Sequence, residues 1–125
     1  GPDKIALITD SMRGAGMPDG PSILGSVKDG QPVIIEDGVA KLPDRSAFAG
    51  SVATADRLVR TMIQVAEVPL VDAIKMMTET PAKIIGIDRD KGKISIGMDA
   101  DLVLFDENIN IKMTVVNGSV VYNDL

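Results

Sequence analysis

The sequence predicts a mixed α/β fold, because patterns typical of strands lie at both ends of the chain and helical periodicity lies between them. Near the N-terminus, the apolar run Ile5–Ile8 is too short for a helix. Near the C-terminus, Asn117-Gly118 is a strong hairpin signal between two apolar segments. Between them, apolar side chains recur at helical spacing. We therefore expect one strand, a meander, three helices and a second meander, in that order.

Composition limits the classes of function. The 125 residues suit one domain or parts of two, and a hydrophobic content of 45% suffices for a core. The net charge of −5 and the scattered Lys and Arg argue against nucleic acid as a partner. No apolar run approaches the roughly 18 residues that a membrane-spanning helix needs. We predict no membrane partner and a cytoplasmic location.

The chain contains neither cysteine nor histidine. Disulfides, thiol nucleophiles and thiolate metal sites are therefore excluded, and a transition metal would have to be held by carboxylates alone. The segment Asp88-Arg-Asp90-Lys-Gly92 begins like a calcium loop but lacks the third ligand position and the closing glutamate. We interpret it as a solvated turn.

Asp10 is the first candidate for chemistry. The run Ile5–Ile8 has the pattern of a buried strand and ends at Thr9-Asp10, before a loop with three glycines and a proline. In sheets and barrels of alternating strands and helices, catalytic groups lie at the carboxyl ends of strands. The alternative is that Asp10 only hydrogen-bonds the turn that follows, as aspartate often does.

A meander of short antiparallel strands is predicted between Ser22 and Pro43, with the turn pairs Asp29-Gly30 and Asp37-Gly38. Turn residues dominate its polar content, so we expect it to be structural. The glycine-bearing loop Phe48–Ser51 follows. Small residues before a helix let backbone N–H groups approach a ligand, which makes Ala49 and Gly50 candidates for main-chain contacts.

The predicted helices and C-terminal strands complete the chain. The helices span about Thr54–Glu67, Pro69–Thr80 and Thr80–Gly86, with Thr80 as the N-cap of the third and Gly86 as its C-cap. The strands are Lys93–Ile96, a buried strand Asp101–Phe105, Ile111–Val115 and Val120–Tyr122.

Four of these segments together resemble the N-acetylglucosamine-6-phosphate deacetylase family of the amidohydrolase superfamily. They are Thr9–Gly20, Phe48–Ser51, Thr80–Gly86 and Lys91–Phe105. The last two are similar to many amidohydrolases, including dihydroorotases and deaminases, and select no substrate. The first two point to the deacetylases. The resemblance covers nearly all of this chain and corresponds to the C-terminal portion of the family's usual length.

The resemblance implies a fold. Residues 1–86 would be the C-terminal part of a metal-dependent-hydrolase (β/α)8 barrel, with the meander inserted at about 22–43, and residues 87–125 would supply strands of the flanking β-sandwich. As an isolated piece the chain would be α+β. An open barrel edge exposes unpaired backbone groups, so we expect a homo-oligomer or self-association of the fragment.

The resemblance also implies an activity, the hydrolysis of the acetamide of N-acetylglucosamine 6-phosphate to glucosamine 6-phosphate and acetate in amino-sugar catabolism. Asp10 would be catalytic, taking a proton from the attacking water and returning it to the departing amine. Phe48, Ala49 and Gly50 would bind the sugar, so the expected partner is a small amino-sugar phosphate. The family uses a divalent metal of the zinc or iron class, whose glutamate and histidine ligands lie upstream, so we expect no metal bound to this chain.

Two alternatives stay open. The chain resembles other amidohydrolases in part, so it could be the corresponding segment of a dihydroorotase-like or deaminase-like enzyme. It could also be a stand-alone, non-catalytic α+β assembly module. Under the leading hypothesis the 125 residues alone have no deacetylase activity, because the metal ligands are not among them.

Overall fold

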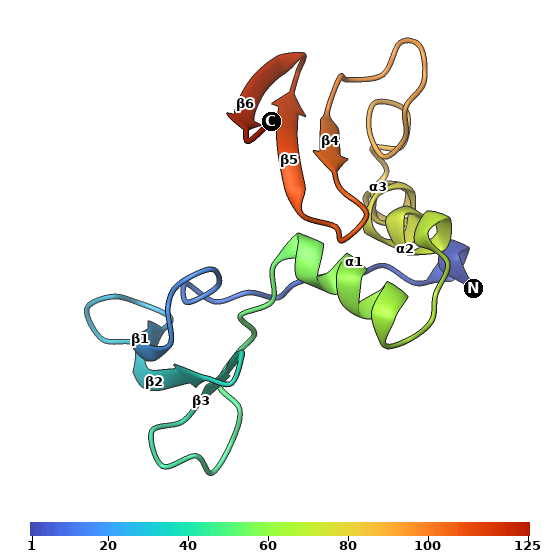
Figure 1. Cartoon of the computed structure of the whole chain (residues 1–125). Coiled ribbons are helices and arrows are strands. Elements are labelled where there is room, and N and C mark those ends of the chain that lie inside the picture. Colours follow the sequence, from blue (N-terminus) through green and yellow to red (C-terminus); the bar gives the residue numbers. More distant parts are fainter. The chain divides into compact units, whose positions relative to one another are not determined.

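The computed structural model describes residues 1–125, which form two compact units. We call Ile8–Arg57 the meander unit, and Gly1–Leu7 together with Leu58–Leu125 the helix–sheet unit. The chain contains helices and two three-stranded sheets, which confirms the predicted α/β class (Figure 1). The division predicted near residue 86 concerns a parent barrel and sandwich, and it stays a prediction.

The meander unit contains an antiparallel sheet in the order β1-β2-β3, formed by β1 Gly20–Leu24, β2 Gln31–Glu36 and β3 Val39–Lys41. β2 and β3 lie where the sequence predicts short antiparallel segments. β1 begins before the predicted meander, and residues 25–30 form a longer loop to β2 in place of the predicted Asp29-Gly30 turn. The β2–β3 turn is Asp37-Gly38, and both residues have positive φ, 55° and 71°. Two successive residues of this kind match the right-handed twist of a hairpin, which is why an Asp-Gly pair stands there.

The core of the meander unit lies on one face of this sheet. Side chains that alternate along β2 and β3 point into it and meet side chains from the flanking loops. Its buried members are Met12, Val33, Ile35, Ala40, Ala49 and Val52, with Leu24 and Leu42 packed against them. The loops before β1 and after β3 are therefore held on the sheet by apolar contacts.

The helix–sheet unit begins with a short 3-10 turn, Pro2–Lys4, and contains α1 Ala55–Gln64 from Leu58 onward, α2 Leu70–Met77 and α3 Glu79–Ile85. Three buried residues, Val59, Ala73 and Ile109, form an apolar cluster in this unit. Val59 is the buried residue of α1. None of the helices is long and apolar enough to cross a bilayer.

The predicted caps of the third helix are half right. Gly86 is its C-cap in the left-handed conformation, with φ 76° and ψ 26°, as expected for glycine. Thr80, in contrast, is not the N-cap, because α3 begins at Glu79 after Thr78. The Thr80 hydroxyl is buried and donates instead to the Pro2 carbonyl oxygen at 2.6 Å.

The predicted buried strand Ile5–Ile8 is wrong in both respects. No ladder pairs it with another strand, and the Ile8 side chain is 74% exposed. One backbone bond holds it, from Leu7 N–H to the Met76 carbonyl oxygen at 2.8 Å. An apolar run forms a buried strand only when neighbours cover it and pair with it, and this chain supplies no such strand.

The second sheet has the order β4-β5-β6, with β4 Leu102–Phe105, β5 Ile111–Val116 and β6 Ser119–Asn123, all antiparallel. The β5–β6 turn is the predicted Asn117-Gly118 hairpin, with φ 49° and 77°. Val103 and Leu104 are about half exposed, so β4 is not the buried strand we predicted.

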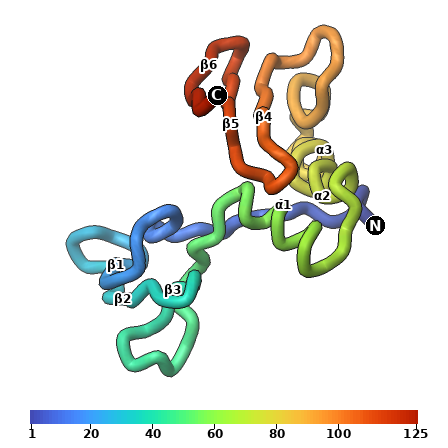
Figure 2. Tube along the Cα trace, viewed as in Figure 1, coloured from blue at the N-terminus to red at the C-terminus, as the bar shows by residue number.

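The predicted strand Lys93–Ile96 is absent. Figure 2 shows the chain from α3 to β4 as loops, and the side chains of Ile94 and Ile96 are almost fully exposed. The alternation of apolar and polar residues in this segment is typical of a strand, but no neighbouring strand pairs with the segment.

Candidate functional site

Asp10 lies in the meander unit, at the beginning of its loop-rich half. Its φ of 46° is in the left-handed region, which aspartate tolerates better than most residues. The side chain is exposed and makes no hydrogen bond or ion pair within the chain. Asp10 therefore does not hydrogen-bond the turn that follows, which was the alternative role predicted for it. Its carboxylate is accessible to a ligand.

A parallel bridge next to Asp10 brings the two candidate segments together. Ser11 pairs with Ser51 in parallel, and Met12 N–H donates to the Ser51 carbonyl oxygen at 2.8 Å. The Ser11 hydroxyl donates to the carbonyl oxygen of Ala53. The segment that carries Asp10 and the loop Phe48–Ser51, far apart in the sequence, therefore run side by side in the meander unit.

The three residues predicted to bind the sugar differ in what they can offer. Phe48 is 77% exposed, and its ring is available for contact. Ala49 is 5% exposed, and its N–H already donates to the Ala40 carbonyl oxygen at 2.8 Å, so neither its methyl group nor its amide is free. Gly50 is exposed, and no hydrogen bond within the chain uses its N–H.

Gly50 is required by both conformation and space. Its φ is 96°, which side chains of L-residues rarely adopt. A Cβ built there would lie 3.3 Å from the Met12 Cγ and 3.3 Å from the Leu24 Cδ1. Its amide can therefore be approached closely by a ligand, which fits the predicted main-chain contact better than Ala49 does.

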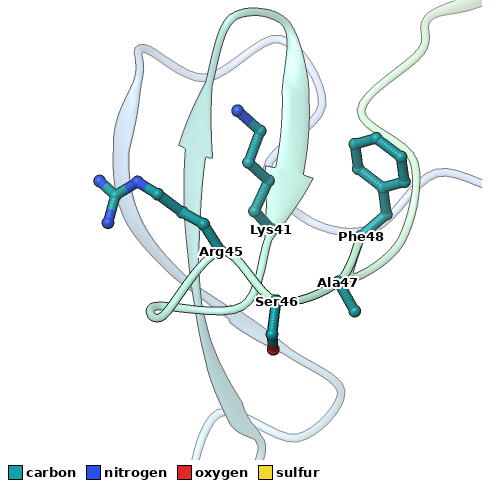
Figure 3. Close-up of a pocket in the computed structure, with 5 residues that line it drawn as sticks. All are labelled: Lys41, Arg45, Ser46, Ala47 and Phe48. Carbon is teal, nitrogen blue, oxygen red and sulfur yellow. The ribbon is translucent and has the colours of Figure 1, made fainter.

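A shallow hollow of about 320 Å³ adjoins Phe48 (Figure 3). It is lined by Lys41, Arg45, Ser46, Ala47 and Phe48. In Figure 3 the side chains of Lys41 and Phe48 project to one side of the loop, away from Ser46 and Ala47. The predicted substrate loop thus forms one wall of a hollow that also contains two cationic side chains.

Carboxylates neutralise both cations of this hollow. Arg45 Nε and Nη2 donate to the two oxygens of Glu36 at 2.9 and 3.0 Å, and Lys41 Nζ lies 3.2 Å from Glu36 Oε1 and 3.1 Å from Asp37 Oδ2. Hydrogen bonds from Arg45 and then Lys41 lower the pKa of the Glu36 carboxyl. The hydrogen bonds that Lys41 donates to Asp37 and then to Glu36 raise the pKa of its ammonium group. Sequence reasoning missed this network, although charges of both signs around the Asp37-Gly38 turn were a usable signal.

A second hollow, of about 220 Å³, lies on the glycine-rich loop of the meander unit. Arg57 closes one side of it, and its Nη1 donates to the Gly38 carbonyl oxygen at 2.8 Å. The hollow is lined by Gly14, Gly16, Met17, Asp19, Ile35, Gly38, Val52, Thr54 and Arg57. Asp10 lines neither hollow, so this chain does not by itself enclose the candidate catalytic group.

The residues present do not make a metal site. No group of three or more Asp, Glu, His or Cys side chains is placed to hold a metal ion, and the chain has no histidine. Asp88 and Asp90 lie in a loop of turns and do not form such a group either. Any metal chemistry would have to use ligands from outside these 125 residues.

Comparison with known proteins gives consistent matches. A model of the amidohydrolase family matches residues 5–121. The N-acetylglucosamine-6-phosphate deacetylase of Lysinibacillus sphaericus is 38% identical over 120 residues, which are 96% of this chain and 30% of that protein. The N-acetylgalactosamine-6-phosphate deacetylase of Escherichia coli O157:H7 is 33% identical over 116 residues, 93% of this chain and 29% of that protein.

A solved structure agrees with these matches. The crystal structure of N-acetylglucosamine-6-phosphate deacetylase from Thermotoga maritima superposes with a TM-score of 0.83 at 34% identity, and the match covers 98% of this chain and 32% of that one. The chain thus spans less than a third of the length of each of these three relatives.

Proposed function

This chain belongs to the amidohydrolase family, and from that premise we propose that it is the C-terminal portion of an enzyme that hydrolyses the acetamide of N-acetylglucosamine 6-phosphate. The products are glucosamine 6-phosphate and acetate. The names of the Lysinibacillus and Thermotoga relatives support this substrate. The observation that carries the proposal is the Ser11–Ser51 bridge, because it puts the segment of Asp10 beside the loop Phe48–Gly50.

Asp10 acts as the proton shuttle of the reaction. Its carboxylate accepts a proton from the water that attacks the acetamide carbonyl carbon, and it returns that proton to the nitrogen when the C–N bond breaks. Two properties suit it to this role: the side chain is exposed, and no group within the chain competes for its oxygens.

The loop Phe48–Gly50 binds the sugar. The exposed Phe48 ring packs on an apolar face of the pyranose, and the Gly50 N–H donates to a polar group of the substrate. Ala49 contributes through its carbonyl oxygen, since its amide is bonded to Ala40. The neighbouring hollow beside Lys41 and Phe48 leaves room for the part of the substrate that extends beyond the loop.

The amidohydrolase family is generally metal-dependent, and the residues present here do not supply the ligands. We place the ligands of a zinc- or iron-class ion in the part of the protein that precedes residue 1. With that part present, residues 1–86 complete a (β/α)8 barrel, and residues 87–125 join a β-sandwich. We expect this whole enzyme to be a cytoplasmic homo-oligomer.

A deacetylase assay tests the proposal. The protein that contains this chain with its upstream region, supplied with divalent metal, should release acetate and a free amine from N-acetylglucosamine 6-phosphate. The 125-residue chain alone, at the same concentration and with the same metal, should release neither. Turnover by the chain alone, or no turnover by the longer protein with any divalent metal, would contradict the proposal.

One observation favours a second substrate. The Escherichia coli relative that acts on N-acetylgalactosamine 6-phosphate is 33% identical, close to the values for the glucosamine enzymes. The two sugars differ only in the configuration of one hydroxyl group, which the residues described here do not distinguish. The ratio of kcat/KM for the two phosphates decides between them, and we expect it to favour the glucosamine derivative.

A further inference from the structure

Two motifs that the proposed function leaves unused meet at the β5–β6 turn. One is the hairpin pair Asn117-Gly118, and the other is Asp99-Ala-Asp101, part of the segment Lys91–Phe105 that resembles many amidohydrolases. Asn117 N–H donates to Asp101 Oδ1 at 2.8 Å, and Gly118 N–H donates to the Ala100 carbonyl oxygen at 3.0 Å. Both amides of the turn are therefore bonded to one short segment.

A lysine fixes the carboxylate of this segment. Lys91 Nζ donates to Asp101 Oδ2, and it also lies 2.8 Å from Asp99 Oδ2. The hydrogen bonds from Lys91 and then from Asn117 N–H lower the pKa of the Asp101 carboxyl, so the acceptor stays charged at neutral pH. We call Lys91, Ala100 and Asp101 the turn clamp.

The turn carries a reactive pair. In an Asn-Gly sequence the backbone nitrogen of the glycine can attack the Cγ of the asparagine side chain, because glycine has no side chain to obstruct the approach. The N–Cγ bond forms, the Cγ–Nδ2 bond breaks, and ammonia leaves with the proton that the backbone amide releases. Water then opens the five-membered imide at either carbonyl and gives aspartate or isoaspartate.

The clamp opposes this chemistry at its first step. The attacking nitrogen is that of Gly118, and its hydrogen is held by the Ala100 carbonyl oxygen rather than being free to leave. The turn backbone is fixed in the left-handed region, with φ 49° at Asn117, by the bond to Asp101 and by the pairing of Val116 with Ser119. Asn117 is exposed, so water and base have access once the turn opens.

We propose that Asn117 is a latent deamidation site, and that the turn clamp sets its rate by holding the Asn117-Gly118 turn closed. An isoaspartate at this position would add one methylene to the backbone of a two-residue turn. The cross-strand pairs Val116–Ser119 and Val115–Val120 would then lose their register. Because β5 is the only neighbour of β6, the modification would detach the last strand of the sheet.

The test follows deamidation of the 125-residue chain at neutral pH and body temperature by peptide mapping and mass spectrometry, with isoaspartate measured enzymatically. The chain has four asparagines, so Asn108, Asn110 and Asn123 serve as internal references. We expect Asn117 in the native chain to react more slowly than in the chain unfolded in guanidinium chloride. Asp101→Ala should speed Asn117 by about threefold or more, because a hydrogen bond to a charged acceptor holds the turn closed.

Asp99→Ala is the matched control, because it removes the other carboxylate of Lys91 and leaves both amides of the turn bonded. Asn117 should react at the native rate in this variant. Equal rates in the native and unfolded chains, or no increase in Asp101→Ala, would overturn the proposal.

A further variant covers the case of global unfolding. If Asp101→Ala speeds the deamidation of all four asparagines together, the chain has unfolded, and Asp101→Asn replaces it. This variant keeps the size of the side chain, but its acceptor oxygen is neutral, so the hydrogen bond from Asn117 N–H is weaker and the ion pair with Lys91 is lost. It must speed Asn117 alone, and an unchanged rate would reject the role of the clamp.

Discussion

The loop after Asp10 approaches the core of the meander unit closely at Gly14. A Cβ built on Gly14 would lie 2.1 Å from Ile35 Cδ1 and 2.9 Å from Met12 Sδ. Ile35 is in the core of the meander unit and is 3% exposed, so its side chain has little room to move. We therefore predict that Gly14→Ala destabilises the meander unit and displaces the loop.

The size of the effect follows from the atoms involved. Forcing a methyl group into a packed core costs about 1–3 kcal/mol, and the clash with a terminal methyl places this case in the lower half of that range. Ile35→Val removes the clashing Cδ1 atom and by itself costs about 0.5–1.5 kcal/mol. In the Ile35→Val background, Gly14→Ala should therefore cost about 0.5–1 kcal/mol less than in the native background, because the contact at 2.9 Å with Met12 Sδ remains.

Equilibrium unfolding in urea of the native chain, the two single variants and the double variant measures this coupling. Leu42→Val serves as the matched background, because Leu42 packs on the same core but contributes none of the three atoms nearest to a Cβ on Gly14. The free energy lost on Gly14→Ala should be unchanged there. If the loss is the same in the Ile35→Val background as in the native one, Gly14 does not lie against Ile35 and the seating of the loop is wrong.

Three further predictions concern other contacts. Hydrogen bonds from Arg45 hold the pKa of the Glu36 carboxyl below its ordinary value. The stability that this pair contributes is therefore complete above the unfolded pKa and is lost as pH falls through the lower folded pKa. In Glu36→Gln, the free energy of unfolding measured against pH should lack this decrease at acid pH. Arg60 donates hydrogen bonds of 3.0 Å to the carbonyl oxygens of Asn108 and Ile109. Arg60→Lys should therefore lower the free energy of unfolding in urea by about 1 kcal/mol, since a lysine cannot donate both bonds in this geometry. An unchanged urea midpoint would contradict the role of these two hydrogen bonds. Gly50 has a φ of 96°, and an added Cβ would lie 3.3 Å from two neighbouring side-chain atoms. Gly50→Ala should therefore raise KM and so lower kcat/KM of the complete enzyme, and an unaltered KM would show that Gly50 is not part of the sugar site.

Local signals predicted the elements that form from adjacent residues. Asn117-Gly118 and Asp37-Gly38 form the expected hairpin turns because their positive φ is a local preference. Gly86 ends its helix for the same reason. The prediction of a buried strand at Ile5–Ile8 was wrong, because such a strand depends on neighbouring strands and no local pattern shows whether they are present. The prediction of Thr80 as an N-cap was wrong, because its hydroxyl donates to a residue distant in the sequence, at the Pro2 carbonyl oxygen.

The candidate site divides in the same way. Asp10, Ala49 and Gly50 were candidates from local pattern, and the resemblance to a family added Phe48 and a role for each residue. The contact between their segments, through Ser11 and Ser51, joins positions that no local pattern connects. The structure also separates Gly50, with a usable amide, from Ala49, whose amide is bonded to Ala40. The ion pairs of Glu36 escaped prediction because a meander rich in turn residues was expected to be structural only.

The central claim is that Asp10 transfers the proton in deacetylation, and one pair of variants of the complete enzyme tests it most directly. Asp10→Asn keeps the size of the side chain and removes its basicity, whereas Asp19→Asn makes the same change at another exposed position of the loop that follows Asp10. We predict that Asp10→Asn lowers kcat by about 10²-fold or more with KM little changed, and that Asp19→Asn retains nearly full kcat. An Asp10→Asn enzyme with native kcat and an unaltered pH profile would contradict the account.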